Sequence, residues 1–221
     1  MTAKVVLFDF DGTIADTYNA IAKITNQLSS EFGYKALNEE ELLLLKNLSS
    51  REIVKLSEIS IFKIPFLVRR VRSELSKEIA DLSPIKGMTS ILFELKNRGY
   101  TLGIVTSNNK ENVEIFLRKN KLDSLFSYVY SSTSIFGKHR VINQAIRNNS
   151  LRKADVIYVG DETRDIRSSR KSNIGVVAVS WGFNSAEILQ EYHPDYLADT
   201  PQELLQAINL HHSQTATTTV N

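Results

Sequence analysis

The feature of this sequence that most limits its fold is a set of five short apolar runs separated by stretches with helical periodicity. Four of the runs are almost continuous in Val, Ile, Leu and aromatic residues, which is typical of strands covered on both faces, as in parallel sheets. The sequence therefore predicts an α/β fold with a doubly wound, mainly parallel sheet. The runs are 5–9 (VVLFD), 101–106 (TLGIVT), 128–131 (YVYS), 156–160 (VIYVG) and 176–180 (VVAVS).

Helices are expected between these strands. In the stretch 89–98, Ile91, Leu92 and Leu95 share one face, and Gly99 follows as a residue that ends helices. Similar patterns predict helices over 110–119, 138–148 and 163–172.

Residues 16–82 interrupt the alternation of strands and helices. This segment contains no convincing strand, but it has helical pattern, for example over 18–32 and 39–48. We therefore expect a helical cap over 16–82, inserted into a core made of 1–15 and 83–211, with Pro84 and Gly87 at the return. The polar end of the chain, 212–221, predicts a disordered tail.

Composition excludes several classes of protein. The 221 residues carry 27 basic and 25 acidic side chains, a balance that does not predict a nucleic-acid or membrane partner. The chain has no cysteine, which excludes disulfides, thiolate metal sites and cysteine nucleophiles. No run approaches the roughly 20 apolar residues needed to span a bilayer, and Asp9 and Asp11 break the first apolar run. We expect a cytoplasmic protein; the sequence does not indicate its oligomeric state.

Polar side chains gather where four of the predicted strands end. Ligands bind at the carboxyl ends of the strands in open parallel sheets, so these residues are expected to converge on one site. They are Asp9, Asp11, Gly12 and Thr13 after the first strand, Thr106, Ser107 and Asn108 after the second, Lys138 after the third, and Asp161 and Asp165 after the fourth.

The residue types at these strand ends suit phosphoryl chemistry. Asp9 and Asp11 share a face if the strand continues, and with Asp161 they form an all-oxygen set that favours Mg²⁺. Hydroxyl and amide donors can hold phosphate oxygens, Lys138 can neutralise charge, and an aspartate can be the nucleophile. Each residue also has an ordinary interpretation, such as a helix cap or a surface lysine. Their occurrence at four consecutive strand ends favours a shared site.

At this point the sequence resembles a known family, the haloacid-dehalogenase-like hydrolases, and within it the phosphoglycolate-phosphatase-like branch. The matching stretches are DFDGTIADT at 9–17, PIKGMTSILFELKNRGYTLGIVTSN at 84–108, Lys138, YVGDETRDI at 158–166, and 180–208. The resemblance implies a Rossmann-like core and a mobile helical cap whose closure excludes water. One departure is His139, which stands where a proline often follows the lysine in this branch.

The resemblance also implies roles for the site residues. Asp9 is the expected nucleophile, and Asp11 the acid that protonates the leaving oxygen and then activates water. Asp9, the backbone carbonyl of Asp11, and Asp161 are expected to hold Mg²⁺, with support from Asp165. Gly12, Thr13, Ser107 and Asn108 are expected at the substrate, together with Thr106. Lys138 is expected to pair with Asp9 and the phosphate.

The expected function is hydrolysis of a small phosphorylated metabolite, with phosphoglycolate as the candidate substrate. One alternative is a phosphosugar mutase of the same family, and a weaker one is a receiver-like aspartate phosphoacceptor with a signalling role. Residues 61–72 (IFKIPFLVRRVR) carry Lys63, Arg69, Arg70 and Arg72 among apolar residues. We interpret them as an amphipathic helix with a solvated basic face. The alternative is that Arg51 or one of these arginines binds a second anionic group of the substrate.

Overall fold

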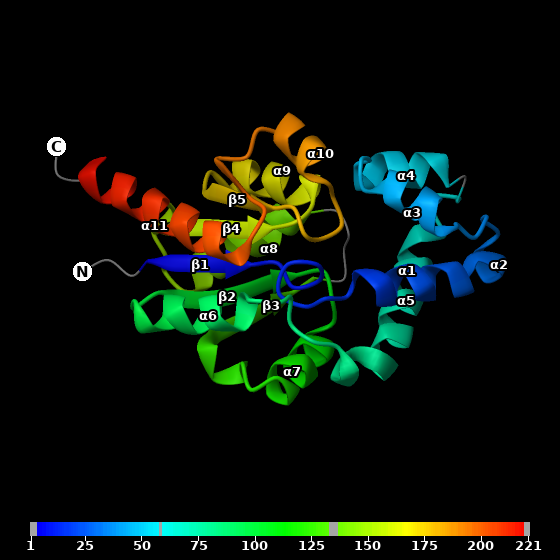
Figure 1. Cartoon of the computed structure of the whole chain (residues 1–221), viewed down its shortest axis with the longest axis horizontal. Helices are drawn as coiled ribbons and strands as arrows, with labels where there is room; N and C mark the ends of the chain where they lie inside the picture. The colour runs from blue at the N-terminus through cyan, green and yellow to red at the C-terminus, as the bar shows by residue number, and fades with distance from the viewer. Residues whose placement is uncertain (1–3, 58, 133–136, 219–221) are drawn as a thin grey trace.

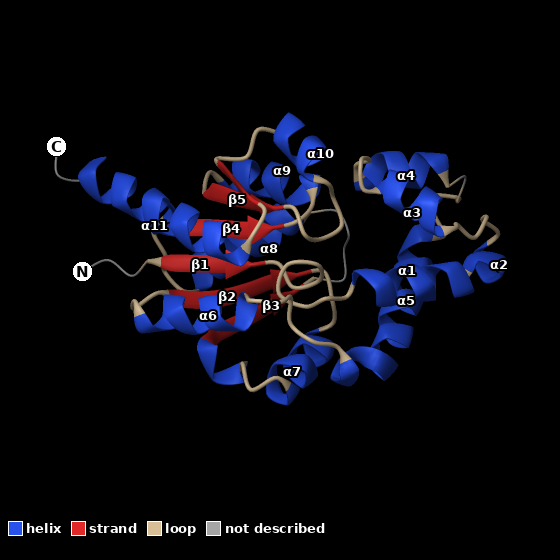
Figure 2. Ribbon diagram, in the orientation of Figure 1, coloured by secondary structure: helices blue, strands red, loops and turns tan. Residues whose placement is uncertain are grey.

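A six-stranded sheet, parallel throughout, forms the centre of the protein in the computed structural model, which describes residues 4–57, 59–132 and 137–218. The strand order is β3-β2-β1-β4-β5-β6 (Figures 1 and 2). The predicted doubly wound α/β fold is therefore confirmed. The strands are β1 (Val5–Phe8), β2 (Thr101–Thr106), β3 (Phe126–Ser131), β4 (Val156–Gly160), β5 (Gly175–Val179) and β6 (Tyr196–Ala198).

Helices cover both faces of this sheet, and the sidedness follows from the two-residue period of β1. Val6 and Phe8 face the cluster that includes apolar side chains of α6, α7 and α11. Val5 and Leu7 face the opposite cluster, which contains side chains of α8. All four are fully buried, which explains why the run is continuously apolar. The core helices are α6 (Met88–Asn97), α7 (Lys110–Lys119), α8 (Lys138–Asn148), α9 (Thr163–Ser172), α10 (Ala186–Glu191) and α11 (Pro201–Thr218).

A group of helices between β1 and α6 lies beyond the carboxyl ends of the strands, where the strand arrows point in Figure 1. Ile24 of α1 and Leu75 of α5 are buried where these two helices pack. The expected helix over 18–32 is divided, because α1 ends before Leu28. The helices are α1 (Tyr18–Gln27), α2 (Ser29–Phe32), α3 (Glu39–Leu45), α4 (Ser50–Leu56) and α5 (Ile64–Glu78), followed by the 3₁₀ turn η1 (Ile79–Asp81).

The two connections between this cap and the core run side by side. Asp16 N donates to Ser83 O at 3.0 Å, and Ile85 N donates to Ile14 O at 2.9 Å. Ala15 and Pro84 form an isolated antiparallel bridge. The outgoing and returning chains are thus tied together at the base of the cap.

The end of the chain differs from its prediction. The expected disordered tail from residue 212 is wrong for 212–218, because α11 continues through Thr218; residues 219–221 lie outside the described part. His212 is only 1% exposed and stacks on Tyr100, with ring centroids 5.3 Å apart and planes 19° apart. This aromatic contact packs α11 against the core at His212, where the surrounding sequence is polar. Over the described ranges, no helix combines the length and apolarity needed to cross a membrane.

Candidate active site

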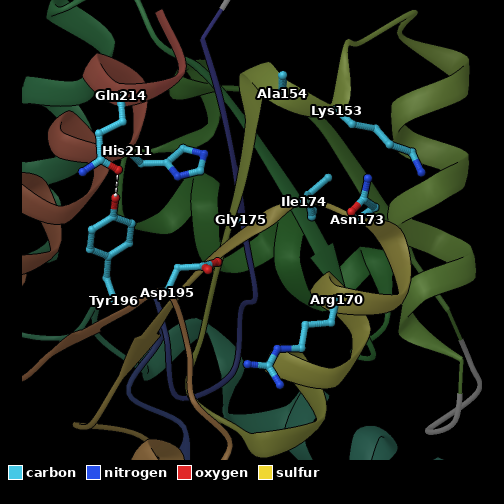
Figure 3. A pocket seen from close by; sticks show the side chains of 10 residues that line it. All are labelled: Lys153, Ala154, Arg170, Asn173, Ile174, Gly175, Asp195, Tyr196, His211 and Gln214. Carbon is cyan, nitrogen blue, oxygen red and sulfur yellow. Dashed lines mark hydrogen bonds between the residues drawn. The ribbon is translucent and has the colours of Figure 1, made fainter. Parts of the chain in front are cut away.

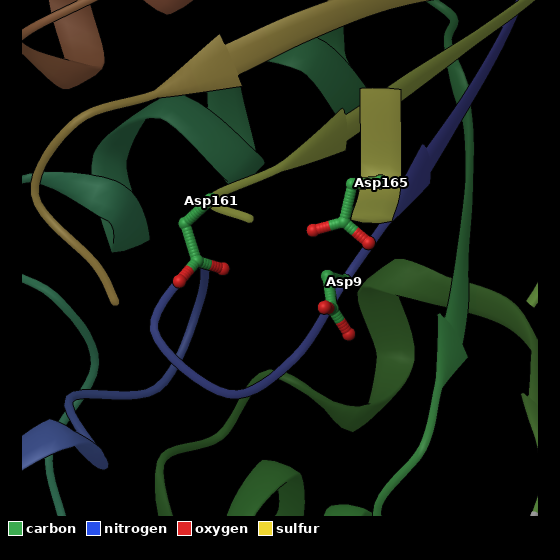
Figure 4. A group of neighbouring side chains, drawn as sticks. All are labelled: Asp9, Asp161 and Asp165. Carbon is green, nitrogen blue, oxygen red and sulfur yellow. The ribbon is translucent and has the colours of Figure 1, made fainter. Parts of the chain in front are cut away.

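Three buried carboxylates meet at the carboxyl end of the sheet. Asp9 follows β1, Asp161 follows β4, and Asp165 lies in the first turn of α9. One oxygen from each lies within 4.8 Å of the others, and Figure 4 shows the three groups turned toward a common space. Sequence reasoning gave Asp165 a supporting role, whereas in the structure its carboxylate belongs to the same group as Asp9 and Asp161.

Lys138 is the positive charge of this cluster. It is the first residue of α8 and follows Gly137, whose φ of +111° lets the chain turn into the helix. Its Nζ lies 2.5 Å from an oxygen of Asp9 and 2.5 Å from an oxygen of Asp165, and only 5% of its side chain is exposed. Burial alone would lower the pKa of Lys138, but the charges of Asp165 and Asp9 outweigh it and raise the pKa, so the ammonium stays charged.

The loop after β1 holds the carboxylate of Asp161. Thr13 Oγ1 donates to Asp161 Oδ1 at 2.6 Å, and Phe183 N donates to Asp161 Oδ2 at 2.8 Å. A Cβ at Gly12 would lie 2.4 Å from Asp161 Oδ2, and φ there is +73°, so glycine is required for this close approach. Thr13 was expected at the substrate; the structure places its hydroxyl on Asp161, where it orients that carboxylate.

Asp11 is held by the turn that follows β2. Asn108 Nδ2 donates to both oxygens of Asp11, at 3.0 and 3.1 Å. Thr106 Oγ1 accepts a hydrogen bond from Asn108 N at 3.0 Å, which fixes the turn. The pKa of Asp11 is raised to about 7, because burial and the charge of Asp9 together outweigh the hydrogen bond from Asn108, which lowers it. A carboxyl group with such a pKa can both give and take a proton near neutral pH.

The sequence interpretation missed Arg164, which lies beside these acids. This residue of α9 forms an ion pair with Glu162, with Nη2 2.5 Å from Oε1. Its Nη2 also donates to Ser107 Oγ at 3.4 Å. Its signal in the sequence is its place in GDETRD, three residues beyond Asp161.

Residues 182–185 connect Asp161 to the cap. Asn184 N donates to Asp161 O at 3.2 Å. The side-chain amide of Asn184 donates to Lys46 O at 3.2 Å and to Leu48 O at 3.0 Å, both in the cap. Lys46 Nζ in turn donates to Gly182 O at 2.9 Å. The structure therefore shows the cap docked onto the loop that also positions Asp161.

The donor set at Asp9, Asp161 and Asp165 suits a hard divalent cation. Lys138 contacts two of the three carboxylates, those of Asp9 and Asp165. Burial together with Glu162, Asp9 and Asp165 raises the pKa of Asp161 well above its usual range. An oxygen-preferring cation would relieve this repulsion without requiring protonation. The residues present therefore fit a metal site of the Mg²⁺ type.

Three cavities bear on where a substrate could bind. One, of about 220 Å³, lies between cap and core and is lined by Asp11, Asn108 and Arg164. A wider one, of about 660 Å³, lies at the other end of the sheet, near the start of β5 (Figure 3). Polar groups on its wall already bind neighbours: Asp195 accepts from Val176 N at 2.8 Å, and Tyr196 Oη donates to Gln214 at 3.0 Å. A third cavity, of about 470 Å³, is lined by Lys138 and Arg164. The two cavities at the acidic site are therefore the one beside Asp11 and the one beside Lys138.

Comparisons with known proteins agree with this geometry. Residues 6–179 match the family model described as haloacid dehalogenase-like hydrolase. The chain is 38% identical over 205 residues to a phosphoglycolate phosphatase of Synechococcus elongatus, covering 93% of this chain and 97% of that protein. It is 24% identical to the pyrophosphatase PpaX of Oceanobacillus iheyensis, covering 94% and 98%. The crystal structure of a predicted phosphatase from Clostridium acetobutylicum superposes with a TM-score of 0.81 at 23% identity, covering 94% and 99%. The chain therefore belongs to the haloacid dehalogenase-like hydrolases, in the branch that resembles phosphoglycolate phosphatase.

Proposed function

We propose that this protein is a Mg²⁺-dependent phosphatase that hydrolyses a small phosphate monoester through an aspartyl-phosphate on Asp9. The observation that carries the proposal is the buried contact of Lys138 Nζ with Asp9, inside a cluster of three carboxylates that faces the cap. A carboxylate fixed in this way, next to an acid with a pKa near 7, is suited to nucleophilic attack followed by proton transfer.

The residues divide the reaction between them. The carboxylate of Asp9 attacks phosphorus, and the bond to the leaving oxygen breaks while Asp11 supplies a proton to that oxygen. Asp11 then takes a proton from the water that attacks the aspartyl-phosphate, which releases phosphate and restores Asp9. Thr106, Ser107 and Asn108 lie at the end of β2, where their donors can hold phosphoryl oxygens.

Two positive charges would neutralise the negative charge on the transferring phosphoryl group, those of Lys138 and Mg²⁺. Lys138 offers an ammonium already placed against Asp9. Mg²⁺, held by Asp9 and Asp161 with Asp165 close by, would supply Lewis-acid stabilisation of the phosphoryl oxygens. The docked cap would shield the reacting groups from bulk water.

The proposed substrate is 2-phosphoglycolate. Support comes from the relative at 38% identity, whose name is phosphoglycolate phosphatase and which this chain matches almost end to end. Because fold likeness does not determine the ligand, the substrate is tested separately from the chemistry.

The test is phosphate release from 2-phosphoglycolate and from p-nitrophenyl phosphate, with Mg²⁺ and with EDTA. We expect turnover that needs the metal and is lost in Asp9→Asn. Hydrolysis that persists in Asp9→Asn would contradict the assigned nucleophile. An isomeric phosphate ester formed without free phosphate would show a mutase, and a stable aspartyl-phosphate without turnover would show a receiver-like role.

A further inference from the structure

The cavity beside Asp11 is lined by two arginines that come from different parts of the fold. Arg72 comes from α5 of the cap, and Arg164 from α9 of the core. The apolar part of the lining comes mainly from α1 and α5, including Ile21, Leu67 and Val71. The wall also carries the carboxylates of Asp11 and Glu162, and Glu162 is paired with Arg164. The two guanidinium groups are the positive charges among the lining residues, and a guanidinium binds a carboxylate through two parallel hydrogen bonds.

Arg72 is built into this wall. Its residue is only 8% exposed. Asn112 Nδ2 of α7 donates to the backbone carbonyl of Arg72 at 3.3 Å, which ties this turn of α5 to the core. Burial lowers the pKa of Arg72, Asp11 raises it, and Arg164 lowers it, so the three charges interact across the cavity.

Arg164 is fixed on the core side of the cavity. Glu162 and Ser107 hold its guanidinium, as described above, so its position is set before any ligand arrives. A pre-positioned guanidinium loses less conformational entropy on binding an anion than a flexible one does.

The other basic residues of the cap lie elsewhere. Arg70 forms an ion pair with Glu74 on the same helix. Arg69 is exposed and lies over the ring of Phe66, 5.4 Å from its centroid. Arg51 lines a separate cavity next to Lys138 and Arg167. Of the arginines that the sequence suggested for a second anionic group, Arg72 is therefore the one that lines the cavity of Asp11.

The size of the cavity limits what can bind there. Its volume of about 220 Å³ corresponds to about seven water molecules at roughly 30 Å³ each. Such a space suits a leaving group of only a few non-hydrogen atoms. A planar carboxylate on that group matches the planar fork of a guanidinium.

We propose that Arg72 and Arg164 together bind a carboxylate on the leaving group, which makes the enzyme selective for phosphate monoesters of small hydroxy acids. This inference rests on the proposed function, because Asp11 marks the leaving group only if Asp9 is the nucleophile. A carboxylate held from both walls also bridges cap and core, so the preferred substrate favours the docked cap.

The experiment compares 2-phosphoglycolate with 2-hydroxyethyl phosphate, which replaces the carboxylate by a hydroxymethyl group. The measured quantity is the ratio of their kcat/KM values in wild type, Arg72→Met, Arg72→Lys and Arg69→Met. We expect Arg72→Met to lower this ratio by about 100-fold or more, the usual scale for losing one partner of a buried charge pair. Arg72→Lys should keep part of the selectivity, because it keeps the charge but not the fork. The matched control Arg69→Met, on the same helix, should leave the ratio unchanged.

Each outcome decides between the inference and the function on which it rests. A wild-type ratio near one, or an unchanged ratio in a folded Arg72→Met, overturns the carboxylate site but leaves the phosphatase intact. No metal-dependent phosphate release from either ester or from the aryl phosphate overturns the function itself. If Arg72→Met does not fold, the alternative measurement is the inhibition of aryl phosphate hydrolysis by glycolate, compared between wild type and Arg72→Lys. Glycolate should compete, at least about tenfold more weakly in Arg72→Lys. If it competes no better than ethylene glycol, the inference is wrong.

Discussion

Replacing Lys138 by methionine tests whether one ammonium makes the acidic cluster compatible with folding. Methionine keeps much of the length of the side chain but removes the charge that lies 2.5 Å from both Asp9 and Asp165. Removing one partner of a buried ion pair costs about 3–5 kcal/mol, because the remaining charge loses its compensation. We therefore expect Lys138→Met to lower the free energy of unfolding by about 3–5 kcal/mol at pH 8 in EDTA.

The pH dependence of this loss has a definite sign. Burial raises the pKa of Asp165 to about 6 even though Lys138 lowers it, so removing Lys138 raises it further. A carboxyl group whose pKa is higher in the folded than in the unfolded state stabilises the fold below the unfolded pKa, and this stability is lost as pH rises through the folded pKa. The penalty of Lys138→Met should therefore be smaller at pH 5 than at pH 8.

Urea denaturation followed by the fluorescence of Trp181 measures both effects. Lys110→Met is the matched control, since that lysine is exposed and its ion pair with Glu114 at 3.6 Å should contribute no more than about 1 kcal/mol. A penalty for Lys138→Met below about 1 kcal/mol at pH 8, or one equal at both pH values, would refute the argument from buried charge.

Three further predictions follow from contacts away from Lys138. Asn184→Ala should lower the free energy of unfolding by about 1–3 kcal/mol, because Thr163 N loses its buried acceptor. Asn184→Asp keeps an acceptor for Thr163 N. Both variants lose the amide that donates to Lys46 O, so amide hydrogen exchange at residues 46–50 should become faster in both. Gly103→Ala should lower the free energy of unfolding by about 1–3 kcal/mol or more, since its Cβ would lie 2.1 Å from the Tyr128 ring. The double variant Gly103→Ala/Tyr128→Ala should lose less stability than the sum of the two single variants, because removing the ring removes the clash. Burial is the main cause that lowers the pKa of His212 to about 4. Because the unfolded state then binds more protons, the melting temperature should rise with pH between about 4 and 6.5. His212→Phe should show a smaller rise over this range, and an unchanged pH profile would contradict the argument.

Much of the core could be predicted because its residues obey local rules. The run 156–160 is buried throughout and reads as a continuous apolar strand. The helices over 110–119 and 138–148 have the bounds that their periodicity predicts. Asp9, Asp161, Asp165 and Lys138 lie together because parallel strands bring their carboxyl ends to one edge of the sheet.

The remaining features depend on contacts between distant segments. β6 is a three-residue edge strand, Tyr196–Ala198, too short to give a periodic signal. The last turns of α11 are polar, and the contact that holds them joins His212 to Tyr100. The helical period of α5 places Arg72 on the buried face with Ile64 and Leu75, and Arg69 outside it. Because a charged residue does not count as part of an apolar face, the sequence pattern did not distinguish the two arginines.

The loop 182–185 gives this fold a physical route by which the cluster of Asp9, Asp161 and Asp165 and the cap affect each other. Phe183 N binds the carboxylate of Asp161, while Asn184, the next residue, binds the cap carbonyls of Lys46 and Leu48. A displacement of the cap that pulls on Asn184 must therefore strain the hydrogen bonds that orient Asp161. If a cation bound through Asp161 favours the docked cap, thermodynamic reciprocity requires that docking strengthen cation binding by the same factor. The enzyme would then bind its metal most tightly in the state that also encloses the substrate.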